Sequence, residues 1–578
     1  MKKLLFSIFF LYLNIVSISL FAQEDSISRE LNKSIRVLSE PVVQLSDVVR
    51  LNERPQTHDT LTIPVDIRYV IHTKPVATTY EIKTLKAVNV TGDKLQELYR
   101  GQLSLGFGNY AKSFANLRFM SERSRRQQAG IDIYHYASAG KVKLESNQKV
   151  PAGYSTNYIS AHGKLFKDKI VLSGSITPHL ETVHMYGIET DSLIVPNNEI
   201  YDTTIAKKDS QRRIFSLTTQ GMISSRDTKA EQYKHMQKIL HDFTLITPKL
   251  YENHIALASE GSKKLEKMTV GYTSNFRWSS ISFNPLDSVC SQNFSQLTLL
   301  PFITTSLENW NLHAGIKLSN VWGFKQFKAY PDIIFSYNYN NHALVPYLQY
   351  KGNLETYSLK DMYAENPYCI DSLMLQPTNF ASIFKFGIQG KIAQNIPFNT
   401  FIGFSKAENM HFWINDALFT DTAQNKFNVV YDNTSIFTTG FETGIQQKAF
   451  SMNLRFQYSN YSLDSLQRAW HKPGLEGKYS IRYNIIHPRT NKNKLILRAD
   501  VFYEDMRYAQ QAFTQNEIKL APLFDCNLGV EYYYSSVLIA FLDFNNLTAT
   551  RYERFYQYPV QRFQIMFGIT YSFSGLRK

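Results

Sequence analysis

The sequence predicts an all-β fold, an antiparallel β-barrel of roughly 18–22 strands that is integral to an outer membrane. Its 578 residues include 39 Phe and 36 Tyr, yet mean hydropathy is only −0.28. Apolar and polar residues alternate with period two over segments of about ten residues, the length of a tilted strand that crosses a bilayer. Beyond the N-terminus no run approaches the ~18 apolar residues of a spanning helix, and only helices and closed barrels satisfy their backbone groups in hydrocarbon.

Residues 1–22 have the pattern of a secretory signal peptide. Lys2 and Lys3 form a positive start, Leu4–Leu13 is apolar, and Ala22 closes a plausible cleavage site. The alternative is a retained N-terminal transmembrane helix. Export from the cytoplasm fits a predicted location in the outer membrane of a Gram-negative cell.

Residues 23–100 differ from the rest of the chain. The segment begins with a polar stretch and continues with extended, proline-punctuated sequence. It is too short for much of a hydrophobic core of its own. We predict an extended periplasmic segment without a full plug domain, which either binds a periplasmic partner or threads into the barrel mouth.

Residues 101–578 carry the alternation that predicts the barrel. Apolar side chains occupy alternate positions in 450–459, 478–485 and 563–573, and Lys, Arg, Gln and Asn fill many positions between them. A soluble sandwich also alternates, and it stays open as an alternative. Long segments that end in aromatic residues favour a membrane barrel, because aromatic girdles lie at both membrane interfaces.

Connections between the predicted strands vary in length. Longer loops are expected at 186–210, 355–378 and 505–522, where the alternation lapses. We also expect a charged loop at 226–240, with a helical turn as the alternative.

Charge and cysteine content exclude several classes of protein. The net charge of +14 is spread along the chain without a concentrated basic patch, so nucleic acid is not an expected partner. Anionic lipid headgroups fit better, including those of outer-membrane lipid and lipopolysaccharide. Cys290, Cys369 and Cys526 lie far apart and lack Cys/His metal spacing, so we predict no disulfide framework, no metal site and no cofactor.

The closing segment from Leu528 to Phe573 resembles the C-terminal end of a TonB-dependent outer-membrane receptor barrel. It contains a penultimate strand, Asn546-Leu547, a loop with Tyr558-Pro559, and a last strand that ends aromatic-x-aromatic. This resemblance implies that the barrel-assembly machinery reads the last strand during insertion. The implied signal residues are Phe567, Ile569, Tyr571 and Phe573.

Receptors of that family carry a plug domain before the barrel, and no plug motifs occur here. The resemblance therefore indicates a plugless barrel of the type found in Bacteroidetes outer membranes. One short segment is similar to a TonB box, the stretch through which the periplasmic TonB protein would pull. The segment comprises Asp59, Thr60, Leu61, Thr62 and Ile63. An ordinary extended strand explains the same residues equally well.

The chain is not expected to be an enzyme. No GxSxG, HExxH, P-loop or GxGxxG motif occurs. His135, with Ser138 nearby and Ser160 and His162 in the next segment, raises the idea of a His–Ser pair that hydrolyses lipid esters on the barrel wall. However, His135 and Ser138 are three residues apart and point to opposite faces of a strand. We interpret His135 as a lone histidine on the polar face.

Two functions remain open from the sequence. The first is passage or binding of a solute, as in a porin or receptor. The second is a structural role as a barrel subunit of an outer-membrane assembly, secretion or envelope-biogenesis complex.

Basic residues on the predicted polar face would favour anionic solutes, although any barrel interior needs polar residues. They are Lys385, Lys391, Arg455, Lys478 and Arg482.

Overall fold

The computed structural model describes residues 99–578, apart from internal gaps and the last four residues. The gaps are 123, 145–146, 148, 188–210, 227–232, 247–249, 284–289, 340–342, 417–425, 489–491 and 512–515. The predicted signal peptide and the predicted N-terminal segment up to residue 98 lie outside the described residues, as does the TonB-box-like segment Asp59–Ile63.

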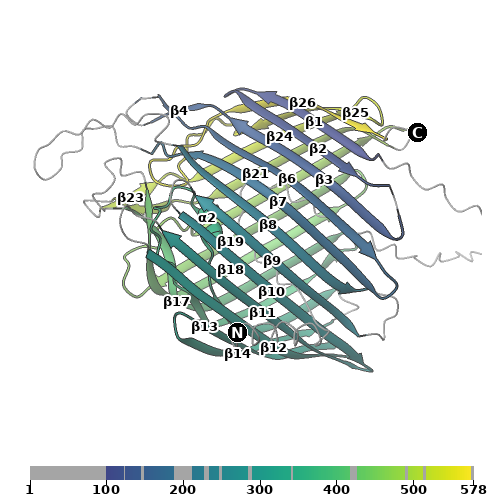
Figure 1. Ribbon diagram of the computed structural model, residues 1–578, viewed down its shortest axis with the longest axis vertical. Coiled ribbons are helices and arrows are strands. Elements are labelled where there is room, and N and C mark those ends of the chain that lie inside the picture. Colours follow the sequence, from purple (N-terminus) through teal and green to yellow (C-terminus); the bar gives the residue numbers. More distant parts are fainter. Residues whose placement is uncertain are drawn as a thin grey trace, which may run out of the picture. The chain divides into compact units, whose positions relative to one another are not determined.

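Twenty-two strands form one antiparallel sheet, which closes where β1 pairs with β26 (Figure 1). All other pairings join strands that follow one another around the sheet in chain order. This arrangement confirms the all-β barrel and lies at the upper limit of the roughly 18–22 strands predicted. The strands are β1 (Gly101–Gly108), β2 (Lys112–Met120), β3 (Gln127–Ser138), β6 (Tyr154–Phe166), β7 (Ile170–His184), β8 (Gln211–Ser225), β9 (Lys234–Ile246), β10 (Leu250–Leu265), β11 (Met268–Phe283), β12 (Cys290–Leu307), β13 (Trp310–Trp322), β14 (Gln326–Tyr337), β15 (Leu344–Glu355), β16 (Thr378–Ala393), β17 (Ile396–Asn415), β18 (Phe427–Gln446), β19 (Phe450–Leu463), β20 (Leu475–Ile486), β21 (Asn493–Glu504), β24 (Leu523–Tyr533), β25 (Leu538–Asn545) and β26 (Gln564–Phe573).

The outer wall of the barrel is apolar. Directly paired residues share a face of the sheet, so the exposed side chains of Phe107 and Phe567, which pair between β1 and β26, mark the outward face. Ile133 and Ile159 mark the same face on β3 and β6. An apolar outward band on a closed barrel places this protein in an outer membrane. Among the described residues, no helix has the length and apolar character that a membrane crossing requires.

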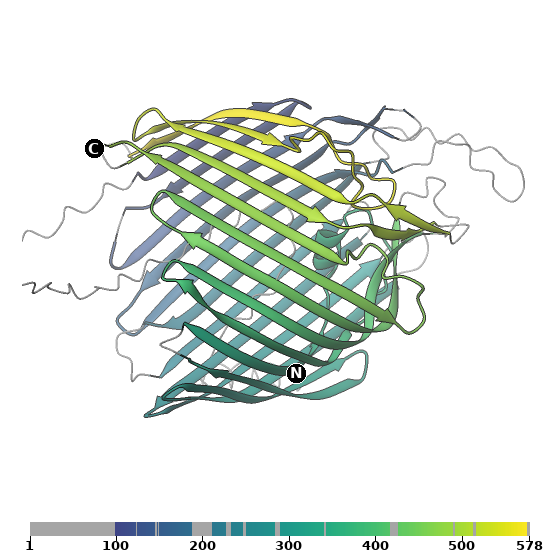
Figure 2. The same cartoon turned by 180° about the vertical axis from the view of Figure 1, so that it is seen from behind.

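The two ends of the barrel carry different connections (Figure 2). The end at which β1 starts and β26 finishes has short turns, such as residues 266–267 and 308–309. The opposite end, which we call the loop end, carries the long connections. In bacterial barrels short turns face the periplasm and long loops face outward, so the loop end is the extracellular one.

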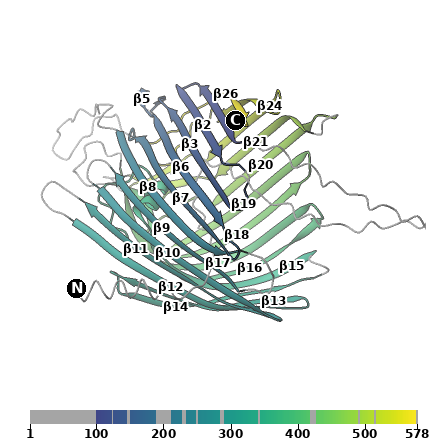
Figure 3. The same cartoon turned by 45° about the vertical axis from the view of Figure 1, so that its right-hand side comes forward.

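Several loop-end connections contain secondary structure of their own. They hold the hairpins β4 (Lys141–Lys143) with β5 (Lys149–Pro151) and β22 (Arg507–Gln510) with β23 (Glu517–Leu520), and the helix α2 (Leu359–Glu365). The strands tilt strongly as they run between the two ends (Figure 3). The main buried core lies at the loop end, where α2 packs with strand ends and neighbouring loops.

Two sequence expectations are wrong in detail. The charged loop predicted at 226–240 is too long, since β9 already begins at Lys234. His135 does not lie on the polar face, because it shares the outward face with Ile131 and Ile133. The neighbouring Tyr134 and Tyr136 look like lipid-facing residues by hydropathy, but they point inward, which reverses the face of the whole segment.

Candidate functional site

The connection between β15 and β16, residues 356–377, folds into the barrel at the loop end, and we call it the α2 loop. Its helix starts with a capping box: the backbone N–H of Asp361 donates to the Ser358 side chain, and the Asp361 carboxylate accepts from the backbone of Ser358. Glu252 of β10 accepts the N–H of Leu359 at 2.9 Å. The start of the helix is therefore bonded to the barrel wall.

An arginine of β8 holds the end of the α2 loop. Arg212, whose side chain is only 3% exposed, donates to the carbonyl oxygen of Cys369 at 2.6 Å and that of Pro367 at 3.0 Å. It also contacts the Asp371 carboxylate at 2.7 Å. One guanidinium thus fixes three points of the loop, as its forked donors allow. Burial raises the pKa of the Cys369 thiol beside it to about 12, so this cysteine stays protonated.

The other side of the α2 loop is bonded to β17 and to the connection after β19. The Glu365 carboxylate contacts His411 Nε2 at 2.9 Å and Lys472 Nζ at 2.7 Å. Burial opposes ionisation of Glu365, but Lys472 and His411 outweigh it and hold the pKa of this carboxyl well below its usual value. Glu365 is therefore charged at neutral pH and forms an ion pair with Lys472.

Backbone pairing adds a third attachment. The N–H of Ile370 donates to the carbonyl oxygen of Phe427 at 2.8 Å, and the N–H of Phe427 donates to that of Tyr368 at 3.1 Å. The α2 loop is thus continuous with the start of β18. Nine strands separate β8 from β18 in one direction around the sheet and eleven in the other. Because its anchors lie on nearly opposite walls, the α2 loop crosses the barrel interior.

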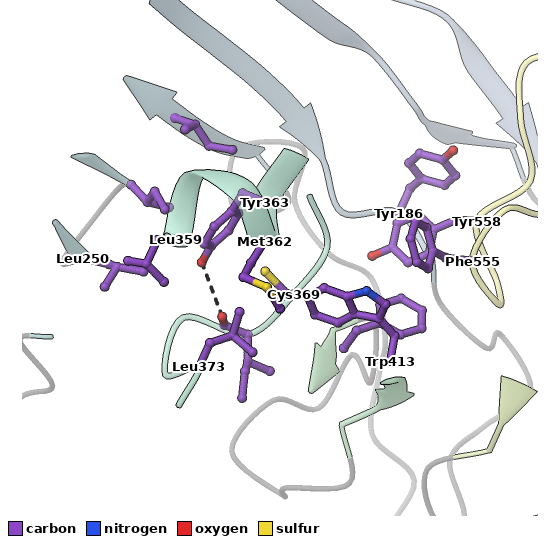
Figure 4. Close-up of a cluster of buried hydrophobic side chains, with 14 of the residues drawn as sticks. Tyr186, Leu250, Leu359, Met362, Tyr363, Cys369, Leu373, Trp413, Phe555 and Tyr558 are labelled. Atoms are coloured by element: carbon purple, nitrogen blue, oxygen red, sulfur yellow. Dashed lines mark hydrogen bonds between the residues drawn. The ribbon is translucent and has the colours of Figure 1, made fainter. Parts of the chain in front are cut away.

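Aromatic side chains from distant connections pack against the α2 loop (Figure 4). The rings of Tyr368 and Tyr558 stack with centroids 3.6 Å apart, and Tyr186 lies 5.0 Å from Tyr558. Phe555 and Trp413 belong to the same buried cluster. The α2 loop is therefore part of a packed layer that includes residues of the connections after β7 and β25.

A row of inward-facing rings lines one wall of the barrel, and we call it the aromatic row. Consecutive ring centroids lie 6.0, 5.9, 4.9 and 6.3 Å apart. Tyr134 and Tyr158 are stacked almost parallel, with an interplanar angle of 9°. Flat rings in a row offer stacking surfaces to a planar or sugar-like solute. In order, the members are Phe541, Phe114, Tyr134, Tyr158 and His179.

The structure places the five predicted lumen bases opposite the exposed apolar face of their strands, although their effect on a solute stays a prediction. Lys385 lies 3.6 Å from the centre of the Phe401 ring and Lys478 lies 5.1 Å from that of Phe502. Arg455 pairs with Glu442 at 3.2 Å. Several bases are thus engaged with the wall itself. Arg482 donates to Asn484 of the same strand, and Lys391 lies beside the irregular end of the β16–β17 pair.

The four predicted assembly-signal residues lie on the outward face of β26. Phe567, Ile569 and Tyr571 are exposed, and Phe573 pairs with Gly101 at the seam of the barrel. Their recognition during assembly stays a prediction. Within the described ranges, no group of three His, Cys, Asp or Glu side chains could hold a metal ion.

Sequence reasoning missed the residues that fix the α2 loop. Arg212, Glu365 and Lys472 are separated by long stretches of sequence and meet only in the closed barrel. One local signal was present: Ser358-x-x-Asp361 before Met362 is a helix-start pattern.

No family model and no curated protein matches the chain. Solved structures do match. The ferripyoverdine receptor of the Pseudomonas aeruginosa outer membrane has a TM-score of 0.59 at 11% identity, over 83% of this chain and 72% of that one. The FrpB iron transporter from Neisseria meningitidis (F3-3 variant) has a TM-score of 0.61 at 9% identity, over 83% and 82%. The siderophore receptor PiuA from Acinetobacter baumannii has a TM-score of 0.58 at 10% identity, over 83% and 82%.

Identities this low show the fold alone. The resemblance seen in the sequence was limited to the last strands, whereas the structural match to receptor barrels covers 83% of the chain.

Proposed function

We propose that this protein is a receptor-like barrel that binds a solute and admits it through the outer membrane, with the α2 loop as its gate. The observation that carries this proposal is the attachment of the α2 loop to β8, β10, β17 and β18 across the interior. A loop held by hydrogen bonds and ion pairs to separate walls can be released at one side while it stays docked at the other.

The aromatic row supplies a binding surface for such a solute. Tyr134 and Tyr158 present stacked rings on the inner wall, and basic side chains such as Lys385 lie elsewhere on the polar face. The structurally similar proteins are named as an iron transporter, a siderophore receptor and a ferripyoverdine receptor. A metal chelate that carries planar rings and negative charge is therefore the solute class that we propose.

The finer parts of the resemblance belong to the same proposal. We infer a plugless receptor of the Bacteroidetes type in which the α2 loop, in place of a plug domain, closes the barrel. The barrel-assembly machinery would insert it into lipid that contains lipopolysaccharide, and TonB would act on Asp59–Ile63. Protein that lacks residues 59–63 should then bind its solute but fail to import it.

Conductance of the full chain in planar bilayers tests the gate. Arg212→Ala removes the hydrogen bonds that hold the end of the α2 loop, which should destabilise its docked position by about 2 kcal/mol or more. The fraction of barrels with an open α2 loop should then rise by roughly 30-fold. Arg468→Ala is the matched control, because Arg468 forms an exposed pair with Glu517 at the same end of the barrel. Equal conductance of wild type and Arg212→Ala would contradict gating by this loop.

A closed loop end also suits the second function, a subunit of an outer-membrane complex. In that case the Arg212→Ala barrel would conduct but take up no solute, and the wild-type protein would leave the membrane in mild detergent together with a stoichiometric partner. Purification as a lone monomer that binds chelate would exclude this role.

A further inference from the structure

Three polar side chains on neighbouring strands form a continuous hydrogen-bonded chain. Ser113 Oγ of β2 lies 2.9 Å from His135 Nε2 of β3, and His135 Nδ1 lies 2.6 Å from Asn157 Oδ1 of β6. When Nδ1 carries the proton and donates it to Asn157, Nε2 is free to accept from the Ser113 hydroxyl. This is the relation of nucleophile, base and orienting group that defines a catalytic triad.

The strand register places this triad on the outer wall of the barrel. Ser113 pairs directly with Phe107, which is 59% exposed, and Asn157 pairs directly with Leu180, which is 38% exposed. His135 follows Ile133 on the outward face of β3. The three residues therefore lie on the outward face of the sheet, where Asn157 also donates from Nδ2 to Ser155 Oγ at 3.4 Å.

Other contacts between a hydroxyl and a histidine in the barrel differ in face and geometry. Thr304 meets His313 at 2.9 Å and Ser279 meets His254 at 2.8 Å, but in both pairs the hydroxyl lies at Nδ1. Both histidines also share the inward face, opposite exposed residues such as Leu312. Only at His135, among these three, does a hydroxyl at Nε2 combine with an amide oxygen at Nδ1.

A polar group on a lipid-facing wall is costly unless it is hydrogen-bonded. Apolar residues at the three positions would avoid that cost, as Ala115, Ile133 and Ile159 do nearby, whereas Ser155 and Thr182 are polar neighbours on the same face. Mutual hydrogen bonding reduces the cost but does not explain why serine, histidine and asparagine stand there together. A chemical role at the lipid surface explains the combination.

We propose that Ser113, His135 and Asn157 form a hydrolase triad that cleaves acyl esters of membrane lipids from the outside of the barrel. His135 lies three residues before the loop end of β3, within about 10 Å of it. Ester carbonyls lie near the boundary between the hydrocarbon core and the headgroups of a bilayer. The triad and the scissile bond of an outer-leaflet lipid are thus at similar depth.

The chemistry balances with water as the second reactant. Ser113 Oγ attacks the ester carbonyl carbon while its proton passes to His135 Nε2. The bond to the alcohol oxygen then breaks, and that oxygen takes the proton from Nε2, which leaves the acyl group on Ser113. Water loses a proton to His135 and attacks the acyl group; the bond to Ser113 breaks, Oγ regains a proton, and a fatty acid is released. Asn157 is a positioning residue, because it acts on the ring of His135 and not on the ester.

Hydrolysis by the purified full chain tests the proposal. The substrates are vesicles of dioleoylphosphatidylcholine in one arm and purified lipopolysaccharide in the other, with released fatty acid as the readout. Ser113→Ala and His135→Ala should each lower the rate at least about 100-fold. Thr304→Ala and His313→Ala are matched controls and should leave it unchanged. Release in the first arm assigns phospholipid as substrate, and release only in the second assigns the acyl esters of lipopolysaccharide.

Two further measurements separate catalysis from structure. A fluorophosphonate probe should label Ser113 in the wild type and in Asn157→Asp, which keeps an acceptor at Nδ1, but much more slowly in Asn157→Leu. The heat-modifiable mobility of all variants should stay that of a folded barrel. Absence of labelling and of fatty-acid release in folded wild type would overturn the proposal. Conductance does not depend on the outer wall, so this result would leave the gate proposal untouched.

Discussion

At the scale of single residues, His471 is the group from which we expect a pH dependence of the loop end. It lies in the connection after β19, and its Nδ1 is 2.9 Å from the carbonyl oxygen of Trp413. Burial lowers its pKa to about 3, despite the opposing effect of that carbonyl. The imidazole is therefore neutral in the folded protein at neutral pH. The sequence does not reveal this environment, because it is formed by Trp413 of β17 and Phe555 of the connection after β25.

The loop end should loosen in mild acid. An unfolded histidine titrates near ~6.5, so the stability contributed by neutral His471 is fully present above that pH. It is lost progressively as the pH falls towards the folded value of about 3. Protease cleavage of the loop end should thus rise between neutral pH and pH ~4.5 in the wild type.

His471→Asn should weaken this pH dependence. Asparagine tolerates the left-handed backbone of this position, where φ is 59°. The matched control, His313→Asn, alters an inner-wall residue outside the loop end. The same cleavage profile in wild type and His471→Asn would show that another group is responsible.

At the scale of elements, the strands and the long connections near 355–378 and 505–522 were predictable, but the helix and the hairpin inside those connections were not. Period-two alternation marks a strand wherever one face meets lipid and the other meets the interior, as in β19 and β26. It failed around His135, because the lipid face there is polar and the inner face is aromatic. The error in the face assignment therefore falls where Ser113, His135 and Asn157 form a hydrogen-bonded chain on the outer wall.

The helix α2 was not predicted from the sequence, for a different reason. It has only seven residues, and its stability comes from the wall beneath it and not from its length. Leu359, Met362 and Tyr363 are buried with helical spacing. Three residues are too few to indicate a helix in a chain that otherwise consists of strands. The partners Glu252 and Arg212 come from strands far away in the sequence.

Ser358→Ala should loosen the α2 loop. It removes the cap that accepts the Asp361 N–H, at a cost of about 1 kcal/mol, and the helix keeps its other anchors. We expect faster protease cleavage within residues 356–377 and a modest rise in conductance. Thr548→Ala is the control, since Thr548 lies exposed in the connection after β25. Unchanged cleavage would mean that the wall alone holds the helix.

At the scale of the whole molecule, the barrel depends on one seam. Every residue of β1 pairs with β26, from Gly101 opposite Phe573 to Gly108 opposite Met566. The alternation at 563–573 indicated the strand on one side of this seam. Their pairing follows from closure itself, because an open sheet of this size would leave two unpaired edges in hydrocarbon.

Phe573→Ala should reduce insertion of the barrel into the outer membrane, because it removes the last aromatic of the predicted assembly signal. Phe456→Ala is the control, since Phe456 is an exposed wall residue away from the seam. The fraction of heat-modifiable protein in outer-membrane preparations measures the effect. Equal insertion of the two variants would show that the terminal aromatic is not read.

The seam also determines the order in which strands can pair during biogenesis. The partner of the first strand is the last one to be synthesised, so no partial chain can bury the edge of β1 in its native pairing. A contact of such high sequence separation is slow to form. The outer edge of β1 therefore stays without its native partner until β26 is available, and exposed edges favour aggregation. We therefore expect that this edge must be protected until the seam closes.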